Sequence, residues 1–216
     1  MKNLFFILAL FFSYNSNSQT ANDYANAANE KFNNKDWEEA ITFFSKAIEE
    51  LEKQPGGLRS TLDMSVSMLS FRATSKQNID DYYGAISDYS RAIELKPDEA
   101  YRYTMRGYSK YLLKDYNGSL VDYDKAIELE PNSNSFFDRA STRIYLKDYY
   151  GAISDLTRGL ELYKPYYSTY SKDVYYNNRG YSKQKLKDMK AACEDYKIAA
   201  ELGNKNSQNN FNKLCN

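Results

Sequence analysis

An internal repeat constrains this chain more than any other feature of its sequence. The octapeptide DYYGAISD occurs at residues 81–88 and again, letter for letter, at residues 148–155. The pentapeptide RGYSK likewise occurs at residues 106–110 and 179–183. The offset between the two octapeptides is 67 residues, close to twice a period of about 34. The chain is therefore expected to consist of repeated structural units of that length.

Five units align on this block. In the second unit, Asp81 and Tyr82 precede a small residue, Ala85, which is followed by an aromatic residue, Tyr89. Twelve positions before the first small residue of each unit stands another one, and these earlier residues are Ala28, Ala73, Gly107, Ala140 and Gly180. Small side chains let two helices pack closely. Each unit is therefore predicted to be a hairpin of two helices.

Helix-capping signals occur at the expected ends of the second helices. The predicted N-cap residues are Asp36, Asp81, Asp115, Asp148 and Asp188. In the first unit, Glu39 stands three residues after Asp36, the spacing of a capping box. Pro97 and Pro131 each follow an AIEL run and are predicted to end the second helix of their units.

This pattern resembles the tetratricopeptide repeat. The resemblance covers residues 22–202 and implies an all-α, right-handed α-solenoid of about five helical hairpins with a C-terminal capping helix. The repeat domain is predicted at residues 19–202, with units at 21–54, 66–99, 100–132, 133–166 and 173–203 and a cap at 204–216. Two connections exceed the family's usual length, around residues 54–57 and 166–173, where additional residues cost little free energy.

Residues 1–18 are predicted to be a signal peptide that is removed on export. Lys2 precedes an apolar run at residues 4–12, and Ser16 and Ser18 have the spacing of small residues at a cleavage site. The apolar run is shorter than the roughly 20 residues that span a bilayer. No stable membrane insertion is therefore expected after cleavage, and an uncleaved anchor is the alternative. The mature protein is expected in the periplasm or outside a Gram-negative type of cell.

Composition and charge argue against several classes of function. The chain has 29 basic and 29 acidic residues, so no net field attracts nucleic acid, and no nucleic-acid partner is expected. It has no histidine, the most frequent general base and metal ligand. No phosphate-binding loop or metal-ligand spacing occurs. The chain is therefore predicted to have no catalytic activity, cofactor or metal site. An enzymatic alternative would place chemistry in the insertions, but residues 166–170 contain no base.

An arginine and an aspartate recur sixteen residues apart and are predicted to form structural ion pairs. These pairs are Arg72 with Asp88, Arg106 with Asp122, Arg139 with Asp155, and Arg179 with Asp195. The first unit has Ala27 and Phe43 at the same two positions, so both charges are absent together. This co-occurrence favours pairs that join helices over the alternative, a stripe of arginines that binds anions.

One face of each first helix is predicted to line a groove. At about 100° per residue, every third or fourth residue of a helix lies on the same face, and the family resemblance implies that this face is concave. The predicted partner-binding residues are Tyr101, Thr104, Tyr108, Tyr111, Phe137, Tyr145, Asn177 and Tyr181. Two interpretations are open for the tyrosines: they anchor a partner, or they pack against the next unit. Packing is favoured for Tyr89 and Tyr103. The face lacks the basic set with which some family members clamp a terminal carboxylate.

Cys193 and Cys215 are the only cysteines, and they either form a disulfide or stay unpaired. The predicted function is a non-catalytic scaffold of the bacterial cell envelope that binds a protein or peptide in the concave groove. The alternative is a structural subunit of an envelope or secretion assembly that binds through its convex face or through the ends of the solenoid.

Overall fold

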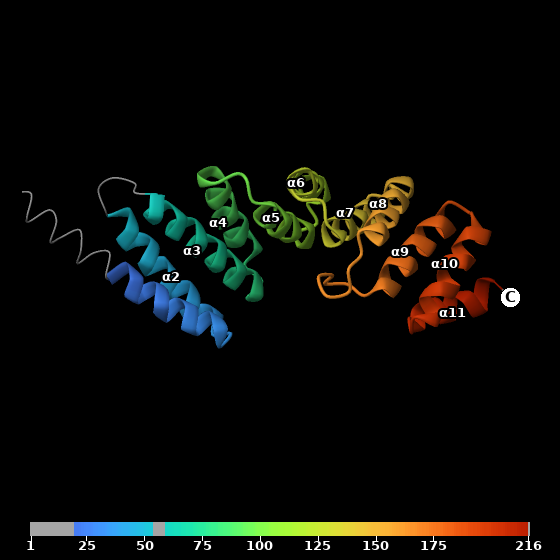
Figure 1. The fold of residues 1–216 in the computed structure, drawn as a ribbon, viewed down its shortest axis with the longest axis horizontal. Helices are drawn as coiled ribbons and strands as arrows, with labels where there is room; N and C mark the ends of the chain where they lie inside the picture. Colours follow the sequence, from blue (N-terminus) through green and yellow to red (C-terminus); the bar gives the residue numbers. More distant parts are fainter. Residues whose placement is uncertain (1–19, 54–58, 216) are drawn as a thin grey trace, which may run out of the picture. The chain divides into compact units, whose positions relative to one another are not determined.

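The structure, a computed structural model, describes residues 20–53 and 59–215. The predicted signal peptide at residues 1–18 lies outside the described residues. The chain divides into two compact units, residues 1–109 and 110–216, and each is described by itself. Every regular element within the described ranges is a helix (Figure 1), which confirms the all-α prediction.

Within the described ranges, consecutive helices follow one another closely, except at the longer connection between α8 and α9. Residues 20–33 are helical, and the first unit continues with α2 (Trp37–Glu52), α3 (Arg59–Asn78), α4 (Tyr82–Leu95) and α5 (Ala100–Leu112), inside which the boundary falls. The second unit contains α6 (Tyr116–Leu129), α7 (Ser133–Tyr145), α8 (Tyr149–Glu161), α9 (Lys172–Lys185), α10 (Met189–Glu201) and α11 (Lys205–Leu214). None of the helices in the described part of the chain has the length and apolar character needed to cross a membrane.

The same turn precedes the second helix of each hairpin. One residue has a left-handed backbone with φ of 62–65°, and these residues are Lys35, Asp80, Lys114, Lys147 and Lys187. The next residue is the N-cap aspartate. At Asp81, Asp115, Asp148 and Asp188, its carboxylate accepts a hydrogen bond of 2.9–3.1 Å from the backbone N–H three residues later, which confirms these four caps.

The predicted capping box at Asp36 and Glu39 is wrong. The Asp36 side chain accepts no capping hydrogen bond, and the Glu39 carboxylate lies 2.5 Å from the ammonium group of Lys31 instead. A cation on the preceding helix therefore competes with the backbone N–H for the carboxylate. The proline predictions are confirmed, because α4 and α6 end before Pro97 and Pro131 at residues with an extended backbone.

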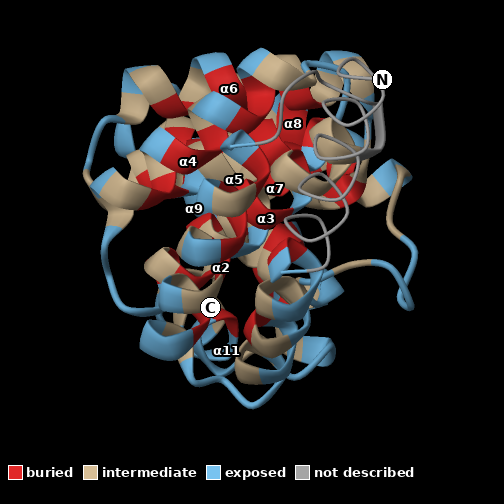
Figure 2. Cartoon of the chain, turned by 90° about the vertical axis from the view of Figure 1, so that its left-hand side faces the viewer, coloured by how far each residue is buried: buried red, intermediate tan, exposed pale blue. Residues whose placement is uncertain are grey.

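Small residues lie where the two helices of a hairpin cross. The alanines at the two small positions of the units are all fully buried, and they are Ala28, Ala40, Ala73, Ala85, Ala140, Ala152 and Ala192. At Gly180 a Cβ atom would lie 3.1 Å from the ring of Tyr196 and 3.3 Å from the carbonyl oxygen of Ala192, so even one methyl group would crowd the contact. The buried residues lie on the helix faces that pack against neighbouring helices (Figure 2).

Candidate functional site

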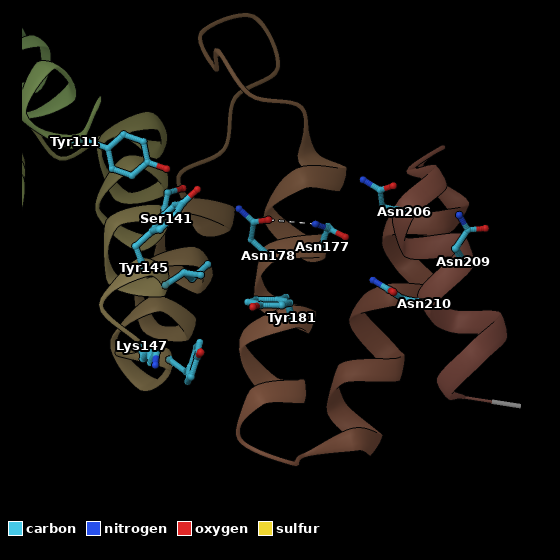
Figure 3. A pocket seen from close by; sticks show the side chains of 12 residues that line it. Tyr111, Ser141, Tyr145, Lys147, Asn177, Asn178, Tyr181, Asn206, Asn209 and Asn210 are labelled. Atoms are coloured by element: carbon cyan, nitrogen blue, oxygen red, sulfur yellow. Dashed lines mark hydrogen bonds between the residues drawn. The ribbon is translucent and has the colours of Figure 1, made fainter. Parts of the chain in front are cut away.

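A pocket of about 880 Å³ lies in the second unit, with α7 on one side, α9 in the middle and α11 on the other side (Figure 3). Its lining consists mainly of four tyrosines and five asparagines: Tyr111, Tyr145, Tyr149, Tyr181, Asn177, Asn178, Asn206, Asn209 and Asn210. Ser141, Ile144 and Lys147 complete it. No lining residue is acidic, and Lys147 is the only charged residue among them. The pocket is therefore almost neutral and rich in amide groups.

The middle of the pocket is built by one face of α9. Asn177, Asn178 and Tyr181 lie within about one turn of this helix. The amide nitrogen of Asn177 donates to the amide oxygen of Asn178 over 3.2 Å. Tyr181 is 37% exposed, and the ammonium group of Lys185 lies 5.1 Å from the centre of its ring. This tyrosine therefore presents a ring and a hydroxyl group to the pocket.

Three tyrosines of the second unit cluster at the α7 side of the pocket. The ring of Tyr145 stacks on Tyr116 at 5.1 Å and meets Tyr111 edge to face at 5.4 Å between ring centres. These contacts hold the rings in place, while Tyr145 remains exposed. Such a cluster offers apolar contact area with little loss of side-chain entropy on binding.

The α11 side of the pocket is missing from the sequence prediction, which assigned residues 204–216 only as a cap. Asn206, Asn209 and Asn210 lie on one face of α11, because they are spaced by three and four residues. That spacing is the signal that could have found them. Lys147, Tyr149 and Asn178 were also absent from the predicted site residues.

Phe137 is a correction to the predicted groove. It is only 7% exposed, since the inserted segment at residues 163–171 folds over it. The ring of Tyr170 stacks on Phe137 with 4.0 Å between centres. The side chain of Asn134 holds the segment through hydrogen bonds to Tyr167 and Thr169. The insertion therefore converts a predicted contact residue into part of the core.

The same segment covers a carboxylate that the sequence did not single out. The hydroxyl group of Tyr170 donates to Asp138 over 2.6 Å. Burial raises the pKa of Asp138 to about 6, although the hydrogen bond from Tyr170 acts in the opposite direction. The protonation state of Asp138, which holds the segment through Tyr170, therefore changes near pH 6.

The remaining predicted groove residues lie in the first unit. Tyr101 is 52% and Tyr108 40% exposed. Thr104 is partly buried, and its hydroxyl group donates to the backbone oxygen of Ala100. Tyr89 and Tyr103 are buried, which confirms the packing interpretation for these two residues. Of the predicted groove residues, the structure therefore brings Tyr111, Tyr145, Asn177 and Tyr181 together in one pocket.

The predicted arginine–aspartate partners are in contact at three positions. Arg72, Arg139 and Arg179 each direct Nε and Nη2 to the two carboxylate oxygens of Asp88, Asp155 and Asp195, at distances of 2.7–3.0 Å. For the remaining pair, Arg106 belongs to the first unit and Asp122 to the second. Within the first unit, Arg106 donates to Ser90 over 3.1 Å.

Each of these aspartates also meets a second cation, which the sequence analysis did not include. The second cation stands four residues after the arginine, and the contacts are Lys76 with Asp88, Lys110 with Asp122, Arg143 with Asp155, and Lys183 with Asp195, at 2.7–2.9 Å. The arginines also reach the preceding hairpin, where Nη1 donates to Ser45, Ser90, Asp124 or Thr157. The arginines therefore join neighbouring hairpins through one repeated arrangement.

Cys193 of α10 and Cys215, the residue that follows α11, form a disulfide bond. The structure thus agrees with the first of the two interpretations, in which the cysteines form a disulfide. Among the residues that the structure describes, no group of three or more potential ligands could hold a metal ion.

The helical hairpins define a helical-repeat protein with a pocket in its second unit. The family model of the tetratricopeptide repeat matches residues 100–133 and 174–206. These two matched segments are tetratricopeptide repeats, and the helical hairpins have the fold of that repeat.

Solved structures of low sequence identity share this fold. MamA (residues 41 to the end) from Desulfovibrio magneticus RS-1 aligns with a TM-score of 0.73 and 17% identity over 85% of this chain and 94% of that chain. YrrB, described as a TPR protein with an unusual peptide-binding site, aligns with a TM-score of 0.69 and 17% identity over 90% and 92%. BtubC from P. vanneervenii aligns with a TM-score of 0.69 and 12% identity over 89% and 90%. No curated protein matches the chain in sequence.

Proposed function

We propose that this protein is a non-catalytic scaffold of the cell envelope that binds an uncharged, extended segment of a partner protein. The segment lies in the pocket between α7, α9 and α11. The observation that carries this proposal is the lining itself, in which tyrosine rings on the α7 side face asparagine amides on the α11 side and no carboxylate occurs.

The chemistry of the lining fits a peptide backbone. A carboxamide group both donates and accepts hydrogen bonds, as each peptide unit does. Tyrosine rings offer apolar area to the side chains between those units. Because Lys147 is the only cation in the lining, the pocket has no clamp for a terminal carboxylate. An uncharged, extended segment can pair its backbone N–H and C=O groups with the asparagine amides of the pocket. Such a ligand leaves the fewest polar groups of the pocket and of the peptide unpaired.

Two features support export to the envelope. The apolar run at residues 4–12 follows a lysine and precedes small residues, as in a signal peptide. The Cys193–Cys215 disulfide suits an oxidising compartment outside the cytoplasm. For the ligand, the unusual peptide-binding site described for YrrB is a precedent on the same fold.

Peptides selected from a random display library on the purified protein test the pocket directly. We expect Tyr181→Ala to weaken binding of a selected peptide by about tenfold, because it removes an aromatic anchor from the pocket. Tyr150→Ala is the matched control, since this tyrosine of α8 is 76% exposed and lies outside the lining. Circular dichroism melts establish that both variants are folded. Equal binding by Tyr181→Ala and the unchanged protein would contradict the proposal.

A separate observation favours the alternative function, which is assembly through the convex face. Tyr83 of α4 and Tyr150 of α8 occupy the same position of the repeated octapeptide, and both are strongly exposed. If the surface around Tyr150 binds, Tyr150→Ala rather than Tyr181→Ala will abolish capture of the partner. The two variants therefore distinguish the two functions.

A further inference from the structure

One wall of the pocket belongs to the last helix of the chain. Asn206, Asn209 and Asn210 of α11 stand opposite the tyrosine cluster, with α9 between them (Figure 3). Within the described part of the chain, the side chains of these three residues form no hydrogen bond with other residues, so their amide groups are available to a ligand. The position of α11 therefore decides whether the pocket is complete.

The α11 helix has little stability of its own. It has ten residues, KNSQNNFNKL, and isolated helices of this length are marginal in water. Asparagine, which it contains at three pocket positions, has a low helix propensity. Ser207 is its only buried residue. The helix therefore depends on its attachments to the rest of the second unit.

Hydrogen bonds attach the first turn of α11. The amide of Asn204 donates to Asp173 over 2.8 Å. The hydroxyl group of Ser207 donates over 2.8 Å to the amide oxygen of Asn177, which itself lines the pocket. These contacts hold the beginning of the helix against α9.

The disulfide attaches the other end. Cys215 directly follows Leu214, the last residue of α11, and its sulfur is bonded to that of Cys193 on α10. Asn209 and Asn210 thus lie between a hydrogen-bonded end and a covalently held end. Without the disulfide, the second half of α11 retains only the partly buried Phe211 and Leu214 as apolar contacts.

We infer that the Cys193–Cys215 disulfide is a positioning device for the pocket, and that ligand binding depends on its oxidation state. This inference rests on the proposed peptide-binding function. A dithiol reductant opens the bond in two exchange steps: one thiolate attacks a sulfur to form a mixed disulfide, and the second thiolate displaces the cysteine. The two cysteines gain two electrons and two protons, and the reductant becomes a disulfide. The second half of α11 then leaves its place, and Asn209 and Asn210 are lost from the wall of the pocket.

Binding of a display-selected, fluorescently labelled peptide tests this with and without dithiothreitol. We expect reduction to weaken binding by about tenfold, and the Cys193→Ser/Cys215→Ser variant to bind equally weakly in both conditions. The Asn206→Ala/Asn209→Ala/Asn210→Ala variant should also bind weakly, but reduction should change its affinity no further, because the wall that the disulfide positions is already inactive. Equal affinity of the oxidised and reduced protein overturns the inference and leaves the proposed function intact.

Hydrogen exchange of the backbone amides supplies a readout that needs no ligand. On reduction, exchange should accelerate in α11 while α9 and α10 stay protected, since only the last helix is released. Unchanged exchange in α11, or loss of protection throughout the second unit, overturns the inference. If no peptide is selected from the library, the proposed function fails, and the exchange experiment still decides whether the disulfide positions α11.

Discussion

The repeated ion pairs show how single residues shape this protein. Asp195 is almost fully buried, and both Arg179 and Lys183 reach its carboxylate at 2.7 Å. Burial lowers the pKa of Arg179, but the hydrogen bond and the charge of Asp195 raise it by more. One carboxylate therefore compensates the charge of two partly buried cations. The loss of Asp195 should thus lower the stability more than the loss of either cation.

Asp195→Ala should destabilise the protein by about 3 kcal/mol or more, because it leaves two cations without their counter-charge. Lys183→Met keeps the contact between Arg179 and Asp195 and should cost on the order of 1 kcal/mol. Urea unfolding measures both values. The Arg179→Ala/Asp195→Ala double variant should lose less than the sum of its single variants.

The exposed pair of Lys125 and Glu128 is a matched control for this measurement. Its atoms are as close, at 2.8 Å, but both side chains are exposed. Lys125→Ala should therefore change the stability by no more than about 0.5 kcal/mol. Fully additive losses in the double variant of the buried pair would show that Arg179 and Asp195 are not coupled.

The insertion between α8 and α9 behaves as an element of its own. It places Tyr170 on Phe137 and Asp138, and its backbone is held by Asn134. The spacing of the repeats in this sequence predicts a connection longer than the family's usual length at this place but says nothing about its course. The contact with Asp138 gives the insertion a dependence on pH.

Asp138 should make the protein less stable as the pH rises from about 4 to about 6. Its pKa is about 6 in the folded chain and 3.8 ordinarily, so the folded state holds the proton more tightly. The stabilisation is complete below the ordinary pKa and is lost as the pH rises through the folded value, by roughly 3 kcal/mol in total. Asp138→Asn keeps an acceptor for Tyr170 and removes the titration. Unfolding curves of the two proteins that stay parallel between pH 4 and pH 7 would contradict this assignment.

For the protein as a whole, the proposed export would decide whether the two cysteines meet oxidising or reducing conditions. The proposed signal peptide at residues 1–18 would direct the chain across the inner membrane. The compartment on the other side is oxidising, and the disulfide is stable there. A protein retained in the cytoplasm would meet reducing conditions instead.

The exported protein should begin at Gln19, because cleavage is predicted after Ser18. Intact-mass spectrometry of the protein from the envelope fraction measures the loss of residues 1–18. Leu8→Arg interrupts the apolar run and should leave the uncleaved chain in the cytoplasm. A full-length mass in the membrane fraction would instead favour the uncleaved anchor.

Regular features of the fold were predictable because they repeat. The capping aspartates, the small residues at helix crossings and the buried aromatic positions each follow from local geometry that recurs in every unit. The Arg–Asp spacing was visible for the same reason. The capping box at Asp36 failed because Lys31, a residue of the preceding helix, competes for Glu39. Local patterns are thus reliable only where no neighbouring helix supplies a better partner.

The helical hairpins follow from the sequence alone, and so does the face of each first helix that carries tyrosines and asparagines, since helical periodicity places residues three and four apart together. Which of those residues line a common pocket depends on tertiary contacts. Phe137 is covered by Tyr170, and α11 adds Asn206, Asn209 and Asn210 opposite Tyr145. Both outcomes depend on contacts between segments outside the repeating pattern, an insertion and a terminal helix, whose positions no periodicity specifies.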